Sequence, residues 1–339
     1  MSKFYSVKVK KVKKLTQDSV EISFVLTNDL NEQFRYISGQ YITISKEIKG
    51  EEVRRAYSIC SDSSSDELSI GVKKVEGGKM STFLTSHVHE GDILNIMPPQ
   101  GNFVLNNERK VVCICAGSGI TPILSMIKSN SHDFTLIYGN KTQDSTMFLD
   151  EIEKINIKKY FTYSREKVDN CFNSRINKEF LKELSSKENI LNADGYYICG
   201  PGDMIDAVED FLINNNIDKS QIHFELFAPK KDTKLVDQKT ENQEIVSDIT
   251  VIIDGDEFEY SLHSNGETIL DSAMNEGADV PYSCKGGVCC TCKAKIIEGK
   301  ATMTENFSLS EDEVDDGFIL TCMAHPASER IIVDFDEMF

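Results

Sequence analysis

The chain has 339 residues and a formal net charge of −18; 40% of its residues are hydrophobic and 27% are charged. This length is about two to three times that of a typical domain, so we expect several independently packed units. The composition excludes a largely disordered or collagen-like chain. No apolar stretch approaches the length of a membrane span, and the N-terminus alternates Val with Lys. We therefore expect a cytoplasmic protein without a membrane segment.

The first 228 residues show two different sequence patterns, one after the other. Up to residue 104, short alternating runs predict an antiparallel β-barrel with strands at 5–12, 20–26, 40–44, 55–59, 68–72 and 93–97. From 105 to 228, apolar strands precede helical stretches, at 110–115 and 121–128, 134–138 and 147–157, 160–164 and 178–186, and 196–199 and 204–214. This alternation predicts an α/β domain with a doubly wound parallel sheet. The polar range 229–247 is predicted to be a linker before a third unit, 248–339.

The third unit holds most of the acidity. Residues 248–339 contain five basic and 20 acidic residues, a balance of −15. Such a field repels nucleic acids and anionic membranes, so we expect neither as a partner, but it attracts a basic protein surface. A docking face for a protein partner is one hypothesis, and an acidic surface kept for solubility is the other.

Five of the ten cysteines cluster in this acidic unit. Cys284, Cys289 and Cys292 form a C-x4-C-x2-C run, and Cys322 follows thirty positions after Cys292. This is the ligand spacing of plant-type 2Fe-2S ferredoxins, which predicts an iron-sulfur cluster. Structural zinc, which normally takes paired C-x2-C knuckles, and bare core thiols are the alternatives. Cys290 fits no ligand spacing and is predicted to be a free thiol.

Residues 248–339 resemble a plant-type ferredoxin of β-grasp fold, and residues 1–228 resemble the ferredoxin-NADP reductase superfamily. The flavin motif of that superfamily stands here as Arg55-Ala56-Tyr57-Ser58. The resemblance implies that Arg55 pairs with the flavin phosphates, that Tyr57 packs on the isoalloxazine ring, and that Ser58 bonds near N5. It also implies that a helix start binds the diphosphate of FAD, with a plain turn as the alternative. That helix start consists of Gly78, Lys79, Met80 and Ser81.

The same resemblance assigns a nicotinamide site. Its dinucleotide contacts would be Gly117, Gly119, Thr121 and the Cys199-Gly200-Pro201 turn. Glu225 and Phe227 match the family's terminal glutamate and flavin-stacking aromatic, so Ser58, Cys199, Glu225 and Phe227 form the predicted catalytic group. Cys199 is expected to position rather than attack, because hydride transfer needs no nucleophile. A buried thiol at Cys199 and ordinary strand residues at Glu225 and Phe227 are the alternatives.

Coenzyme choice depends on the segment after the strand at 160–164. Ser164-Arg165 resembles the pair that grips the 2′-phosphate in NADPH-using relatives, so the sequence predicts NADPH. Glu166, the next residue, keeps NADH open as the alternative, because an acidic group there suits the free ribose hydroxyls.

The order of the three units resembles that of reductase components of multicomponent oxygenases, and within these the reductases of phenylacetyl-CoA epoxidases. A reduced nicotinamide gives two electrons at once, whereas a 2Fe-2S cluster takes one, and a flavin can divide the pair. The resemblance therefore implies an electron path from NAD(P)H through FAD and the cluster to an oxygenase or hydroxylase component. A reductase of a Rieske-type or steroid hydroxylase, and a non-enzymatic iron-sulfur redox sensor, are the alternatives.

Overall fold

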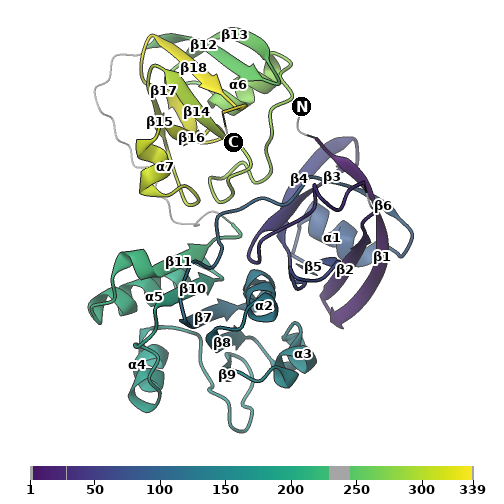
Figure 1. Cartoon of the computed structure of the whole chain (residues 1–339), viewed down its shortest axis with the longest axis vertical. Coiled ribbons are helices and arrows are strands. Elements are labelled where there is room, and N and C mark those ends of the chain that lie inside the picture. Colours follow the sequence, from purple (N-terminus) through teal and green to yellow (C-terminus); the bar gives the residue numbers. More distant parts are fainter. Residues whose placement is uncertain (1–2, 28, 229–244, 338–339) are drawn as a thin grey trace. The chain divides into compact units, whose positions relative to one another are not determined.

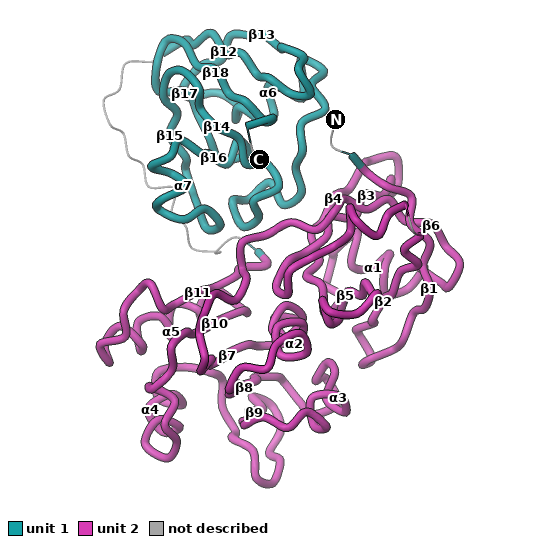
Figure 2. The backbone as a smooth tube through the Cα atoms, viewed as in Figure 1, with its two compact units in different colours: residues 1–3, 228–339 teal, residues 4–227 magenta. Residues whose placement is uncertain are grey.

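A computed structural model describes residues 3–27, 29–228 and 245–337 of the chain. The backbone divides into two compact units, one made of residues 4–227 and one of residues 228–339 together with 1–3 (Figure 2). Residues 229–244 of the predicted linker lie outside the described residues. Each unit has its own sheet or sheets and its own buried core.

The first part of the larger unit is an antiparallel sheet with strand order β4-β3-β6-β1-β2-β5 (Figure 1). Its elements are β1 Tyr5–Thr16, β2 Ser19–Val25, β3 Tyr41–Ile48, β4 Glu51–Ser58, β5 Leu68–Lys73, helix α1 Lys79–Ser86 and β6 Ile93–Ile96. Along β1, Val7 and Val9 are buried while Lys8 and Lys10 are exposed, as the two-residue period of a strand requires. A bridge between Ile59 and Ile70 links the two ends of the sheet, which makes it a barrel.

The second part is a parallel sheet with strand order β11-β10-β7-β8-β9. Its strands are β7 Lys110–Ala116, β8 Asp133–Asn140, β9 Lys158–Tyr163, β10 Gly195–Cys199 and β11 Ile222–Glu225, and its helices are α2 Ile120–Ser129, α3 Leu149–Lys154, α4 Lys178–Lys187 and α5 Gly202–Asn214. Helices α4 and α5 lie on one side of the sheet and α2 and α3 on the other (Figure 1). The order reverses between β7 and β10, and ligands of such sheets bind beyond the carboxyl ends of the strands at this point.

The barrel and the parallel sheet, which the sequence predicts as domains at 1–104 and 105–228, pack against each other within one compact unit. Ser125 on α2 donates a hydrogen bond to the Ser61 carbonyl at 2.7 Å, and Lys128 donates to the Cys60 carbonyl at 3.1 Å. Cys60 and Phe103 belong to the same buried cluster as the core of the parallel sheet. Because these contacts join residues far apart in the sequence, local pattern could not indicate them.

The smaller unit contains a mixed sheet with strand order β13-β12-β18-β14-β16 and a two-stranded sheet of β15 and β17. Its elements are β12 Val246–Ile253, β13 Asp256–His263, α6 Ile269–Asn275, β14 Lys293–Glu298, β15 Ala301–Met303, α7 Glu311–Asp315, β16 Phe318–Leu320, β17 Ala324–Pro326 and β18 Arg330–Asp334. Strands β12 and β18 are parallel, and the other neighbours are antiparallel. This is the expected β-grasp arrangement.

Strand β12 begins inside the predicted linker, two residues before the predicted start of the third unit at 248. Val246 pairs with His263 and Ser247 with Leu262 across the β12–β13 ladder. The Ser247 hydroxyl also donates to the Ser328 carbonyl, and the residue is fully buried. These tertiary contacts extend the strand into polar sequence that reads locally as linker.

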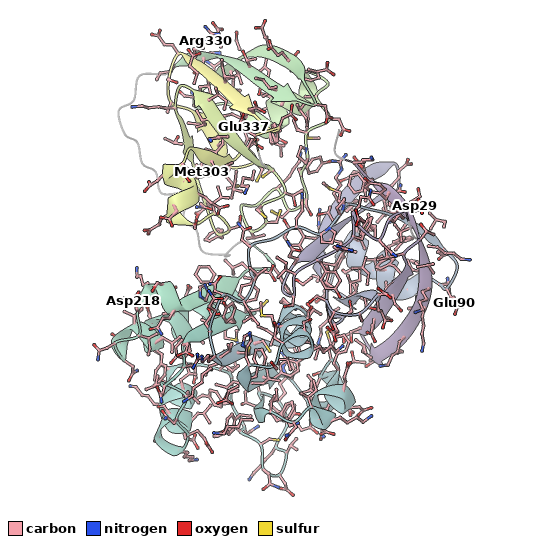
Figure 3. All side chains as sticks on the ribbon, viewed as in Figure 1. Asp29, Glu90, Asp218, Met303, Arg330 and Glu337 are labelled. Atoms are coloured by element: carbon pink, nitrogen blue, oxygen red, sulfur yellow. The ribbon has the colours of Figure 1, made fainter. Side chains whose placement is uncertain are left out.

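Acidic residues outnumber basic ones on the smaller unit. Arg330, labelled in Figure 3, opens β18 and lies 3.7 Å from the carboxylate of Glu298. Helix α7 carries Glu311, Asp312 and Glu313 in its first turn and no basic residue in its last. Acidic groups in the first turn are stabilised by the helix dipole.

In the parts of the chain that the structure describes, no helix has both the length and the apolar character needed to cross a membrane. The cytoplasmic location stays a prediction.

We expect Gly39→Ala to destabilise the larger unit more than Gly50→Ala. Both glycines have positive φ, +101° and +78°, but a Cβ on Gly39 would lie 1.9 Å from the Phe103 carbonyl oxygen, whereas a Cβ on Gly50 meets open space. Left-handed strain alone costs about 1–2 kcal/mol, so Gly50→Ala should lower the melting temperature by about 2–8 °C. Gly39→Ala should lower it at least twice as far in calorimetry, and equal shifts would contradict the close packing at Phe103.

Candidate functional site

Three of the four predicted catalytic residues meet where three strands end. Ser58 ends β4, Cys199 ends β10 and Glu225 ends β11. The Ser58 hydroxyl donates a hydrogen bond to Glu225 Oε2 at 3.2 Å, and Cys199 Sγ lies 4.0 Å from the same oxygen. Ser58 and Cys199 are buried and Glu225 is partly buried, whereas the fourth residue, Phe227, is 43% exposed.

Burial controls the charge of this group. Removal from water raises the pKa of Glu225 to about 8, while the hydrogen bond from Ser58 acts in the opposite direction. Burial raises the pKa of the Cys199 thiol well above its ordinary value, and the nearby Glu225 raises it further. At neutral pH the site therefore holds a protonated carboxyl and a neutral thiol, which fits a positioning role for Cys199.

The β7 and β10 ends approach each other closely at Gly119. A Cβ on this residue would lie 2.1 Å from the carbonyl oxygen of Cys199, so only glycine fits. Gly117 has a φ of +57°, and its carbonyl accepts a 2.8 Å hydrogen bond from the Tyr138 hydroxyl. The loop predicted to bind the dinucleotide is thus held at the switch point of the sheet.

Thr121 takes a different position from the one its predicted role suggests. Its side chain is 1% exposed, and its hydroxyl donates to the Ser118 carbonyl at 3.0 Å. Its methyl group lies 2.5 Å from where a Cβ on Gly71 would stand, so it packs against β5 of the barrel. The side chain therefore joins the two sheets of the unit and begins α2, whereas the sequence predicts a dinucleotide contact.

The Cys199-Gly200-Pro201 turn leads directly into α5. A Cβ on Gly200 would lie 2.5 Å from the terminal methyl of Met204, and Pro201 is the exposed N-cap of the helix. Proline fits there because the first turn of a helix has no intrahelical partner for its missing N–H.

Arg55 and Tyr57 lie on the same face of β4, two residues apart. The Arg55 side chain is exposed and Tyr57 is half-buried. Arg55 Nη1 donates to the Arg54 carbonyl at 2.7 Å. Burial raises the pKa of Tyr57, and the Arg55 charge acts against that rise, which places the guanidinium near the phenol. A guanidinium beside a flat aromatic ring has the chemistry to bind a phosphate next to a ring system.

Helix α1 starts without a side-chain cap, which leaves its first amides available to an anion. Met80 and Ser81 are buried, and the Ser81 hydroxyl accepts a hydrogen bond from the Val75 amide at 3.1 Å. Lys79 forms an ion pair with Glu51. The side chains of the predicted phosphate loop are therefore occupied within the protein, and the backbone amides are what fits the FAD diphosphate.

Ser164 and Arg165 follow β9 and are exposed. The carboxylate of Glu166 accepts a 2.7 Å hydrogen bond from the Gln143 amide. The Arg165 amide donates to the carbonyl of Lys141 at 2.9 Å, so a second cationic residue lies at the neighbouring strand end. Lys141 is not among the residues predicted from the sequence. Its position directly after a strand of a parallel sheet could have indicated it, because ligands of such sheets bind beyond the carboxyl ends of the strands.

The four predicted cluster ligands contact one another in the smaller unit. Cys289 Sγ lies 3.2 Å from Cys284 Sγ. Hydrogen bonds from Cys289 and Cys322 lower the pKa of the Cys284 thiol, and Cys322 also bonds to Cys292. The Gly286 amide donates to Cys284 Sγ at 3.4 Å, as backbone does to cluster sulfurs. The thiols thus form a continuous series.

The four thiols match the ligand number of a 2Fe-2S cluster. Cys290 packs against the apolar core of the smaller unit, while its neighbour Cys289 belongs to the thiol series.

Three family models match the chain in the order that the sequence predicts. They are the oxidoreductase FAD-binding domain at residues 6–105, the oxidoreductase NAD-binding domain at 113–210, and the 2Fe-2S iron-sulfur cluster binding domain at 251–327. The protein is therefore an oxidoreductase that uses FAD, a 2Fe-2S cluster and NAD(P)H.

Similar proteins share this organisation over their full length. The chain is 38% identical to one of the subunits of the 1,2-phenylacetyl-CoA epoxidase of Escherichia coli (strain K12), over 99% of each chain. It is 28% identical to the ferredoxin reductase component of 3-ketosteroid-9-alpha-monooxygenase of Rhodococcus rhodochrous, over 94% and 93%. The solved structure of phthalate dioxygenase reductase has the same fold, with a TM-score of 0.61, 22% identity and 98% of each chain covered. The chain belongs to the family of ferredoxin-NADP-reductase-like electron-transfer reductases that carry a C-terminal 2Fe-2S ferredoxin domain.

Proposed function

We propose that this chain is the reductase component of a phenylacetyl-CoA epoxidase, and that it passes electrons from NADPH to the oxygenase component. The observation that carries the proposal is the 38% identity to a component of the Escherichia coli epoxidase across 99% of both chains. A reductase of a steroid monooxygenase is the second candidate, because the Rhodococcus relative also aligns over 94% of this chain. The buried group of Ser58, Cys199 and Glu225 argues for an enzyme over a redox sensor.

FAD is held by the barrel in this proposal. When bound, it accepts a hydride from the nicotinamide and passes electrons singly to the 2Fe-2S cluster. The Arg55 guanidinium and the uncapped amides of α1 bind the diphosphate, and Tyr57 flanks the ring. These groups supply charge, directed N–H donors and a flat apolar surface, which are the three features that such a ligand requires.

The buried group orients the nicotinamide and holds a proton. Ser58 donates to Glu225, so the hydroxyl and the carboxyl fix each other at the β4 and β11 ends. The neutral Cys199 thiol keeps water out without adding charge. Glu225 stays protonated below about pH 8 and presents an O–H donor in a site with a low dielectric constant.

Arg165 and Lys141 carry the preference for NADPH. Both follow strands that end at the same edge of the parallel sheet, and the Glu166 carboxylate is engaged by the Gln143 amide. Two cations beside the adenosine ribose favour a 2′-phosphate over free hydroxyls.

The ferredoxin unit holds the cluster and binds the partner in this proposal. The cluster ligands are Cys284, Cys289, Cys292 and Cys322. The acidic surface of the same unit docks the oxygenase.

The acceptor is tested by reconstitution. We expect purified protein to support NADPH-dependent epoxidation of phenylacetyl-CoA with the oxygenase components of that system. Hydroxylation of a 3-ketosteroid with the corresponding oxygenase should be much slower, and NADH should replace NADPH poorly. The epoxidation rate should fall as salt rises from about 0.05 to 0.5 M, because salt screens an acidic docking face. Equal support of both oxygenases would contradict the assignment.

The ligand set is tested by two adjacent cysteines. We expect Cys289→Ser to abolish the visible absorption of the 2Fe-2S cluster and its acid-labile sulfide. Cys290→Ser, the matched control one residue away, should retain both. Loss of the cluster in the Cys290 variant would mean that the ligand spacing has been assigned wrongly.

The burial of Glu225 is tested by stability against pH. The folded protein keeps this proton up to about pH 8, whereas the unfolded chain releases it near the ordinary value of 4.5. Stability is therefore lost as pH rises between these two values, by at most about 1.4 kcal/mol per pH unit. Gln carries no such proton, so the melting temperature of Glu225→Gln relative to wild type should rise from pH 5 to pH 9.

The exposed Glu90, labelled in Figure 3, provides the control for that measurement. Glu90→Gln should follow wild type at every pH. If Glu225→Gln behaves in the same way as Glu90→Gln, the carboxyl of Glu225 does not carry a raised pKa.

A further inference from the structure

Strand β11, which carries Glu225, is anchored just before its start, where Gln221 Nε2 donates to the carbonyls of Ala193 and Asp194 at 3.4 and 3.1 Å. It is four residues long, lies at the edge of the parallel sheet, and pairs with β10 alone among the described strands. All four residues are only partly buried. A slip of one residue in the register of this strand would turn every side chain to the opposite face. The position of Glu225 beside Ser58 therefore depends on how the register is held along the strand as well as at its start.

The register places two pairs of residues on one face of β10 and β11. Tyr197 pairs with His223, and Cys199 pairs with Glu225. Because side chains alternate along a strand, His223 and Glu225 point to the same face. The His223–Tyr197 pair therefore lies one step before the Cys199–Glu225 pair.

His223 is held firmly at that step. Its ring stacks on the ring of Tyr197, with centroids 4.7 Å apart and planes at 27°. His223 Nε2 lies 3.7 Å from Glu108 Oε1, and the Tyr197 hydroxyl donates to the same oxygen at 2.9 Å. The side chains of Glu108 and His223 are only 9% and 27% exposed. A ring stack and a shared carboxylate thus fix the strand at one point.

The carboxylate that receives these contacts is itself anchored. Glu108 lies in the segment that connects β6 to β7, and its Oε2 accepts a 2.8 Å hydrogen bond from the Asn106 amide. The Tyr197 hydroxyl oxygen also lies 3.2 Å from the Val104 carbonyl oxygen. A Cβ on Gly195 would lie 2.8 Å from Glu108 Cγ, so glycine lets the carboxylate approach β10.

We infer that His223 is a positioning residue: its ring, held by Tyr197 and Glu108, fixes the register of β11 so that Glu225 lies opposite Cys199 and reaches Ser58. This deepens the proposed hydride-transfer site and depends on the role given there to Glu225. His223 itself contacts neither Ser58 nor Cys199 through any hydrogen bond that the described residues form.

The inference is tested with His223→Ala, which removes the ring, and His223→Phe, which restores the stack without the imidazole. In hydrogen exchange measured by mass spectrometry on the whole chain, the β11 amides should exchange about tenfold faster in the Ala variant. They should exchange at the wild-type rate in the Phe variant. His132→Ala is the matched control, because it removes a histidine ring that packs edge-on to Phe134 of β8, with ring centroids 5.7 Å apart.

The functional readout is the rate of flavin reduction at saturating NADPH in stopped flow. A displacement of about 1 Å at a catalytic group costs up to about 100-fold, so His223→Ala should slow this step at least tenfold. NADPH affinity should change little, and His223→Phe should recover most of the rate. Unchanged exchange and rate in His223→Ala, or a Phe variant as slow as the Ala variant, would overturn the inference.

Two further variants keep the outcome unambiguous. If His223→Ala does not fold, Tyr197→Phe keeps the stack but removes the hydroxyl from Glu108. Tyr197→Phe should then raise the hydrogen exchange rate of the β11 amides by about threefold. An unchanged exchange rate in this variant would count against the inference. Glu225→Gln, measured in the same assay, separates the two claims. A wild-type flavin reduction rate in Glu225→Gln would refute the proposed role of Glu225. A slow rate in Glu225→Gln, together with a wild-type rate and wild-type β11 exchange in His223→Ala, would refute only the positioning role of His223.

Discussion

The close approach of the β7 loop to the end of β10 is the constraint on which the site depends. Gly119 lies against the Cys199 carbonyl with no room for a Cβ, and this contact brings the two strand ends together at the switch point. A parallel sheet delivers all its carboxyl ends to one edge, and the reversal of strand order opens a crevice there. The backbone at this point therefore determines where a dinucleotide can bind before any side chain contributes.

A second constraint follows from burying a carboxyl group without a cation. Glu225 has the Ser58 hydroxyl as its hydrogen-bond donor, and Ser58 belongs to the barrel rather than to the parallel sheet. Neutralisation by a proton is the least costly solution for such a group. The arrangement works only if the barrel and the sheet are fixed against each other, and the bonds of Ser125 and Lys128 to the barrel backbone provide that rigidity.

The core of the ferredoxin unit supports the four cysteine thiols. These thiols must face one another in a loop region, and a mixed sheet with an apolar interior supplies the rigid support. Lys285 beside the first ligand is paired with Asp271 at 2.7 Å, so even one of the few cations of this unit is neutralised locally. The remaining acidic residues give this unit a net negative charge, and the field of such a charge extends beyond direct contact.

The sequence by itself determined the order of an antiparallel barrel, a doubly wound parallel sheet and an acidic third unit with iron-sulfur ligand spacing, because alternation, strand-helix succession and a C-x4-C-x2-C run are local patterns. The β-grasp fold, FAD and the nicotinamide coenzyme were indicated only by resemblance. The same is true of Ser58, Cys199 and Glu225, since Ser58 and Glu225 are 167 positions apart. Only the tertiary structure decided which side chains these patterns leave available. The side chains of Ser81 and Thr121 form hydrogen bonds within the protein. Lys141 lies beside Arg165, Val246 belongs to β12, and His223 lies near Glu108. Such contacts depend on packing between segments, and the local sequence pattern does not indicate them.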